Sequence, residues 1–144
     1  MLDHYRMFAD YNRWANRRVY AAVSELSDSE YREDKGAFFG SLHGTLNHIL
    51  VADRIWMKRF TKEGEAPSRL DAILHEDLNG LTAARVAEDE RIIAWIDSLD
   101  EERLAGHFTY SRSPIRSRSR NGSHGRSLTS STIRPIIVAR RMRP

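Results

Sequence analysis

Hydrophobic residues recur at helical spacing in three separate stretches of the chain. The first stretch, residues 3–26, repeats apolar positions every three or four residues, and Trp14 and Val23 widen its stripe. Residues 27–29, Ser-Asp-Ser, then end the pattern with side chains that favour turns and caps. The pattern predicts one long amphipathic helix, whose apolar stripe consists of Phe8, Tyr11, Ala15, Val19, Ala22 and Leu26.

Two further helices are predicted downstream. Ser41 is a suitable N-cap for a helix that runs to about Phe60, and Asp77 can cap another that runs to about Leu99. A loop with Gly and Pro, residues 63–68, separates them, and residues 70–75 are expected to form a short helical turn. The second helix would bury Leu42, Leu46, Ile49, Val51 or Ala52, Trp56 and Phe60. The third is marked by Leu78, Leu81, Ala84 or Arg85, Ala87 or Glu88, Ile92, Trp95, Ile96 and Leu99.

The texture of the chain changes after these helices. Residues 107–110 are short and extended in character, and residues 113–123 have neither periodicity nor an apolar face. Three long helices with short connections indicate an all-α antiparallel bundle. The pattern is that of a four-helix fold whose fourth helix is missing or disordered. It divides the chain into an incomplete helical bundle, residues 1–111, and an Arg/Ser-rich tail, residues 112–144.

Composition narrows the class of protein. A chain of 144 residues fits one domain, and the absence of cysteine excludes disulfides, thiolate metal sites and a cysteine nucleophile. The first residues lack the apolar run of a signal peptide, and no apolar stretch approaches the roughly 20 residues of a membrane span. We therefore expect a cytoplasmic protein without membrane contact.

The net charge of +3 is the sum of two regions whose charges have opposite signs. Residues 1–111 contain all 20 acidic residues and 14 Lys or Arg, whereas residues 112–144 contain nine Arg and no acid. The basic pI therefore reflects the tail. A nucleic-acid-binding protein could use Arg116, Arg118 and Arg120, which alternate with Ser. Because Lys and acids vanish together at one point, an accidental origin of this charge is favoured over nucleic-acid binding.

Histidine is the residue type most suited to chemistry here. His43 and His48 lie on one predicted helix, about 140° apart around its axis, so they cannot easily share a metal ion. His48 lies at the edge of the apolar stripe, where a neutral imidazole is a good ligand for zinc or nickel. A core histidine hydrogen-bonded to a neighbour is the alternative. Catalytic motifs such as HExxH or a phosphate-binding loop do not occur.

Two other groups of residues are given structural interpretations. The acidic run of residues 88–90, followed by Arg91, is expected to be a solvated helix face. Trp14, Trp56 and Trp95, one on each helix, are expected to serve as core and dimer contacts.

Several segments resemble one known family. The sequence FADYNRWAN of residues 8–16 and the sequence SLHGTLNHILVADRIW of residues 41–56 are similar to the first two helices of the DinB family, also called DinB/YfiT-like. Residues 88–95 and 108–111 are also similar. The resemblance covers roughly residues 1–111.

The resemblance implies a four-helix bundle, often a homodimer, that binds a divalent metal of the zinc or nickel class through three histidines. His48 matches the ligand from the second helix, while the other two come from a fourth-helix motif resembling N-H-x-x-x-H-R-G-Q. Some relatives are metal-dependent transferases that use a low-molecular-weight thiol and a small-molecule substrate. A metal with an open coordination position can favour a thiolate. Two of the three ligands are absent here, so weak or absent metal binding is expected.

The missing motif can be recovered in another reading frame. One permitted set of codons for residues 130–143, preceded by T and read one base earlier, translates as F-F-N-H-Q-T-H-H-R-G-Q-A-H-A. The first two bases of most codons are fixed by the protein sequence, which limits coincidence. We therefore hypothesise a one-base slip near residues 112–116, in a chain that descends from a metal- and thiol-dependent enzyme. The alternative is a non-catalytic helical dimerisation or scaffold protein. The gene's nucleotide sequence tests the slip, because a gene without that shifted motif would exclude it.

Overall fold

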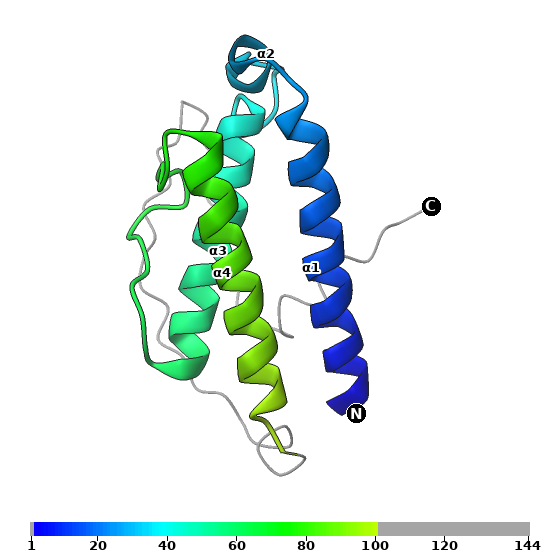
Figure 1. The fold of residues 1–144 in the computed structure, drawn as a ribbon. Coiled ribbons are helices and arrows are strands. Elements are labelled where there is room, and N and C mark those ends of the chain that lie inside the picture. The colour runs from blue at the N-terminus through cyan, green and yellow to red at the C-terminus, as the bar shows by residue number, and fades with distance from the viewer. Residues whose placement is uncertain (1, 101–144) are drawn as a thin grey trace, which may run out of the picture.

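The computed structural model describes residues 2–100, and all of its regular structure is helical. Three long helices lie side by side, with one short helix across an end of the bundle (Figure 1). They are α1 (Leu2–Ser24), α2 (Asp28–Arg32), α3 (Leu42–Thr61) and α4 (Leu78–Asp97). The predicted all-α class is confirmed. The extended segment 107–110 and the place of the expected fourth long helix lie outside the described residues.

Capping residues set the starts of the long helices as the sequence predicted. Ser41 Oγ accepts a hydrogen bond from the Gly44 amide at 3.1 Å, and Asp77 Oδ1 accepts one from Gly80 at 2.6 Å. Each contact satisfies a backbone N–H that has no partner within its helix. The expected helical turn at residues 70–75 is not formed, since that segment contains only a turn at 70–71.

The short helix α2 was not predicted. The Ser-Asp-Ser segment was interpreted as the end of a helix, but Ser27 also begins a new one. Its side chain accepts from the Glu30 amide, and the Glu30 carboxylate accepts from the Ser27 amide at 2.9 Å, which together form a capping box. The S-x-x-E pattern was present in the sequence as the signal for this turn of helix.

Ion pairs and ring contacts show the directions of the long helices. Arg6 near the start of α1 pairs with Asp97 at the end of α4, so α1 and α4 are antiparallel. Asp53 of α3 pairs with Arg85 of α4, and farther along both helices Phe60 stacks on Trp95, so α3 and α4 run in the same direction. The expected antiparallel arrangement thus holds for α1 against the other two. Residues 62–77 connect the end of α3 to the start of α4 and return along the outer side of the bundle (Figure 1).

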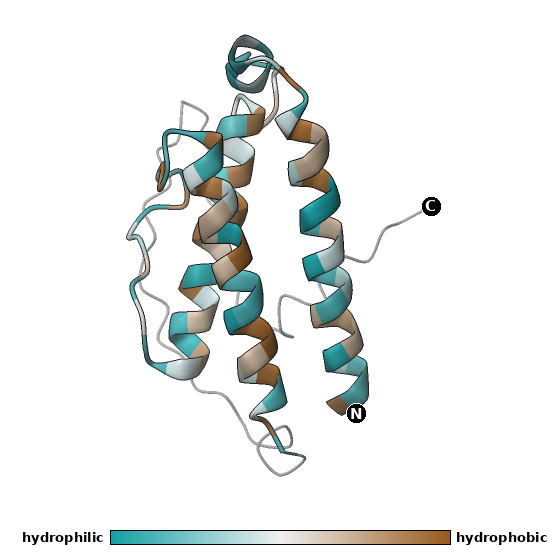
Figure 2. Ribbon diagram, in the orientation of Figure 1, coloured by the Kyte–Doolittle hydropathy of each residue, from teal (hydrophilic) through white to brown (hydrophobic). Residues whose placement is uncertain are grey.

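The buried face of α1 differs from its predicted stripe. Its buried residues are Ala9, Asn16, Tyr20 and Val23, whereas Trp14 is 52% exposed. Tyr11, Val19 and Leu26 are exposed as well. The predicted stripe is therefore buried only in part, since Val23 is in the core and Phe8 and Ala15 are partly buried. Hydrophilic and hydrophobic residues are mixed along α1 (Figure 2).

A charged network occupies the middle of the interface between the long helices. Arg85, 2% exposed, pairs with Asp53 at 2.6 Å and with Asp89 at 2.9 Å. Asn16 donates to the same Asp89 carboxylate at 2.9 Å. Glu88 is also buried and pairs with Arg54 and Arg91. The interpretation of residues 88–90 as a solvated face was therefore wrong for Glu88 and Asp89. Glu88 faces Arg54 of α3, and Asp89 accepts from Asn16 of α1 and pairs with Arg85, four residues earlier on α4.

Candidate metal-ligand site around His48

The site begins at the first turn of α3, where a glycine allows close approach of the preceding loop. A Cβ at Gly44 would lie 2.2 Å from the Phe39 carbonyl oxygen, which is far inside contact distance. Gly40, at φ +74°, turns the chain between Phe39 and α3. The Phe39 ring consequently stacks on the His48 ring, with the centroids 3.7 Å apart and the planes at 19°.

His48 is held in one tautomer. Its Nδ1 lies 2.8 Å from the Leu70 carbonyl oxygen, and a carbonyl can only accept a hydrogen bond. Nδ1 therefore carries the proton and Nε2 keeps its lone pair. Histidines that bind metals commonly donate their second nitrogen to a carbonyl or carboxylate, which orients the ring. His48 thus has the hydrogen bonding of a ligand histidine, and it is only partly buried.

His43 provides the contrast on the same helix. It is 8% exposed, its Nε2 lies 3.1 Å from the His75 carbonyl oxygen, and its ring meets the edge of Tyr31. Both imidazoles thus place a ring nitrogen against a backbone carbonyl, which is the arrangement of the alternative considered for His48, a core histidine hydrogen-bonded to a neighbour. They differ in burial, since His43 is buried and His48 is only partly buried.

Asn47, which the sequence analysis did not single out, fastens the connection 62–77 to α3. Its amide donates to the His43 and His75 carbonyl oxygens, and its carbonyl accepts from the Leu74 and His75 amides. The side chain is fully buried, and both ends of its amide group are used. An asparagine one turn after His43 on an apolar face was the available signal. Asn47 holds the end of the connection, directly before α4, in register with α3.

The donor set tests whether a divalent metal fits these residues. Residues 2–100 contain no cluster of three or more His, Cys, Asp or Glu side chains that could hold a metal ion. One imidazole is insufficient for tight or selective binding, which needs several converging ligands. The described residues do not by themselves fit a tightly bound metal.

The three tryptophans have different environments. Phe60 stacks on Trp95 with the centroids 4.9 Å apart and on Trp56 at 5.8 Å, and Arg59 lies over the Trp56 ring. Trp56 and Trp95 are partly buried where α3 and α4 meet, whereas Trp14 is exposed. The core part of the prediction thus holds for two of the three, and the dimer part stays a prediction.

The family model of the DinB family matches residues 1–122 of the chain. The chain belongs to the DinB family. This match confirms the resemblance carried by the segments around Trp14 and His48. It also agrees with the helical fold of residues 2–100.

A curated DinB relative is available for comparison. The chain is 31% identical over 81 residues to Protein DinB of Bacillus subtilis (strain 168). The alignment covers 56% of this chain and 45% of that protein, so the chain spans less than half the length of the relative it matches. No solved structure matches the chain. No helix within residues 2–100 is both long and apolar enough to cross a membrane.

Proposed function

We propose that this chain derives from a cytoplasmic, metal- and thiol-dependent DinB transferase, and that it has kept one metal ligand, His48. The observation that carries the proposal is the hydrogen bond from His48 Nδ1 to the Leu70 carbonyl, which leaves Nε2 free to act as a ligand. The stacked Phe39 ring fixes the ring plane. His43 makes a similar hydrogen bond but is buried, so His48 is the more accessible of the two imidazoles.

The proposal assigns the other two ligands to the shifted reading frame beneath residues 130–143. The 144-residue chain then lacks stoichiometric binding of zinc or nickel, because one neutral imidazole holds a divalent ion only weakly. With all three histidines present, the metal would stabilise a bound thiolate. The chain's own contribution is to hold one imidazole with its proton on Nδ1.

The experiment compares two full-length proteins, the chain as given and a version in which the shifted frame is restored. After equilibration with Zn²⁺ or Ni²⁺ and gel filtration, elemental analysis should find metal retained only by the restored protein. His48→Ala should remove that metal, whereas His4→Ala, a control on the exposed part of α1, should not. A tightly held stoichiometric ion in the chain as given would contradict the proposal.

A second candidate function, a homodimerisation or scaffold module, is favoured by the exposed side chains of α1. Tyr11 and Trp14 are in ring contact at the exposed surface of α1, and Val19 and Leu26 are exposed farther along the chain. Exposed apolar side chains that gather in this way often mark a protein–protein contact. We propose a second copy of the chain as the partner. Sedimentation should show a dimer that Trp14→Glu dissociates and Lys58→Glu, a charge reversal on the exposed side of α3, does not, while a monomeric wild type would exclude the dimer.

A further inference from the structure

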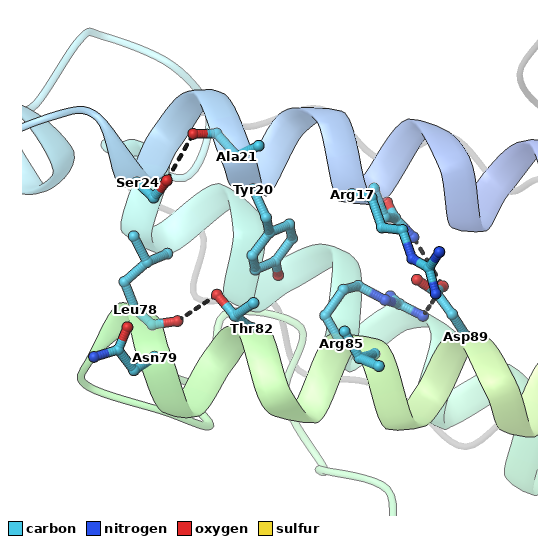
Figure 3. Close-up of a pocket in the computed structure, with 11 residues that line it drawn as sticks. Arg17, Tyr20, Ala21, Ser24, Leu78, Asn79, Thr82, Arg85 and Asp89 are labelled. Carbon is cyan, nitrogen blue, oxygen red and sulfur yellow. Dashed lines mark hydrogen bonds and ion pairs between the residues drawn. The ribbon is translucent and has the colours of Figure 1, made fainter.

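A pocket of about 320 Å³ lies between α1 and α4, near the end of the bundle that carries α2. Tyr20 projects into it from α1, and Arg85 reaches along α4 toward Asp89 (Figure 3). All of its lining residues belong to these two helices, so it is separate from His48 on α3. The volume is at the lower end of the range for small-molecule sites.

Two buried polar side chains in this pocket have unused hydrogen-bonding capacity. Tyr20 is 6% exposed, and its hydroxyl has no hydrogen-bond partner among the described residues. The same holds for Arg85 Nε and Nη2, although Nη2 forms the ion pair with Asp89. An unsatisfied buried polar group costs about 1–3 kcal/mol. Two such residues at one pocket therefore point to a ligand that satisfies them.

The free capacity is mainly that of donors, because Arg85 Nε can only donate and the Tyr20 hydroxyl can donate as well as accept. The Asp89 Oδ1 atom already accepts from Asn12 and Asn16 and is paired with Arg85. Burial raises the pKa of Tyr20 to about 12, so its hydroxyl keeps its proton at neutral pH. Tyr20 and Arg85 thus offer O–H and N–H groups, and a complementary ligand must present acceptor oxygens.

Charge narrows the ligand further. The charged side chains that line the pocket are Arg17, Arg85 and Asp89, and Arg85 is already paired with both Asp53 and Asp89. Arg17 is therefore the cation that is left to attract a further negative charge. Arg17 has an exposed side chain whose ion pair with Glu90 is long, at 3.8 Å, so it can turn toward a ligand. A guanidinium recognises carboxylate oxygens through charge-assisted hydrogen bonds.

We propose that this pocket binds a small organic carboxylate, with its oxygens accepting hydrogen bonds from the Tyr20 hydroxyl and the Arg85 guanidinium. Arg17 closes the ligand's exposed side by charge. The apolar part of the ligand would lie against Ala21, Leu78 and Val86, which also line the pocket. The proposal does not depend on the metal site or on the reading frame of the tail.

The test uses butyrate as the probe, with butyramide and butylamine as its neutral and cationic counterparts. Titration of the full-length, isotope-labelled protein, followed by NMR, should show saturable butyrate binding. The amide shifts should be largest at Ala21, Thr82 and Val86 and absent around His48. Butyramide should bind at least about tenfold more weakly, as expected when a charge-assisted hydrogen bond is lost. Butyrate without saturable binding, or butyramide or butylamine binding as tightly as butyrate, would overturn the proposal.

Two tyrosines give a matched pair of variants. Tyr31 is buried in the same apolar cluster as Tyr20, and its hydroxyl also lacks a partner within residues 2–100, but it does not line the pocket. Tyr20→Phe should weaken butyrate binding about tenfold, and Tyr31→Phe should leave it unchanged. Equal effects of the two variants would show that the pocket does not use the Tyr20 hydroxyl. Comparison of the three probes on the wild-type protein tests the proposal even if a variant fails to fold.

Discussion

Buried polar groups are satisfied in one region of the molecule and left without partners in another. Where the connection to α4 meets α3, Asn47 uses both ends of its amide in hydrogen bonds to Leu74, His75 and His43. Where α4 meets α1, Tyr20 and part of Arg85 are buried without hydrogen-bond partners in the described structure. The difference separates groups that hold the fold from groups available to a ligand, since a satisfied polar network rigidifies a core and an unsatisfied one destabilises it.

The largest expected effect comes from removal of the satisfied amide. Asn47→Ala leaves the Leu74 and His75 amides and two carbonyl oxygens without their partner, and should lower the free energy of unfolding by about 3 kcal/mol or more. Urea denaturation followed by circular dichroism measures this. Asn79→Ala, on the exposed face of α4, is the control and should change stability by about 0.5 kcal/mol or less. A small effect of Asn47→Ala would mean that the Asn47 hydrogen bonds do not hold the connection 62–77 against α3.

A smaller loss is expected where the loop approaches α3. Gly44→Ala places a methyl group against the Phe39 carbonyl, at 2.2 Å before relaxation, and should cost about 1–3 kcal/mol despite the better helix propensity of alanine. In the frame-restored protein, the variant should also weaken metal binding, because the Phe39 ring over His48 must move. Unchanged stability and unchanged metal affinity would show that the loop relaxes without disturbing His48.

Asp89, in the interface between α1 and α4, should make the stability of the protein depend on pH. Burial raises the pKa of Asp89 above its ordinary value of 3.8, against the attraction of Arg85 and the Asn16 hydrogen bond. A raised folded-state pKa stabilises the protein below the unfolded-state value, and that contribution is lost as the pH rises through the folded-state value. The wild-type protein should therefore lose stability relative to Asp89→Asn as the pH increases above about 3.8.

The matched control for that pH profile is Glu90→Gln. Glu90 is the next residue on α4 and its side chain is 51% exposed, so its substitution should leave the slope nearly unchanged. Denaturant midpoints of the wild type and of both variants, measured from pH 3 to 7, give the two pH profiles to be compared. If the wild-type protein instead gained stability relative to Asp89→Asn as the pH rises, the Arg85 ion pair would outweigh burial.

The smallest effects are expected for the two tyrosines. Tyr31→Phe removes a buried hydroxyl that has no hydrogen-bond partner in the described structure, so the free energy of unfolding should stay the same or rise by up to about 1 kcal/mol. Tyr20→Phe should behave in the same way when no ligand is added. Thermal denaturation compares both with the wild type, and a loss above about 1 kcal/mol would reveal a partner for that hydroxyl.

Local chemistry predicted the helices better than it predicted their faces. Ser41 and Asp77 are caps that act within one turn, so the sequence located both helix starts. The burial of Glu88 beside Arg54 and of Asp89 beside Asn16 depends on residues of other helices, which only the packed bundle brings together. A run of acids alone could not show this.

The sequence predicted one residue of the candidate site, His48. His48 was found from its place on the helix and from the family resemblance, and the family was confirmed. Its tautomer depends on Leu70, 22 positions away, and could not be predicted. The Tyr20 pocket could not be predicted either, because its lining residues belong to α1 and α4, which only the packed bundle brings together.

The shared direction of α3 and α4 gives the bundle an electrical polarity along its axis. The positive ends of two helix dipoles meet at the end that carries α2, and α1, which runs the other way, can compensate only one of them. Acidic side chains gather there, with Asp28 in α2 and Glu76 and Asp77 before α4, while Lys58, Arg59 and Lys62 lie around the negative end of α3. The side chains thus neutralise an imbalance that the path of residues 62–77 creates.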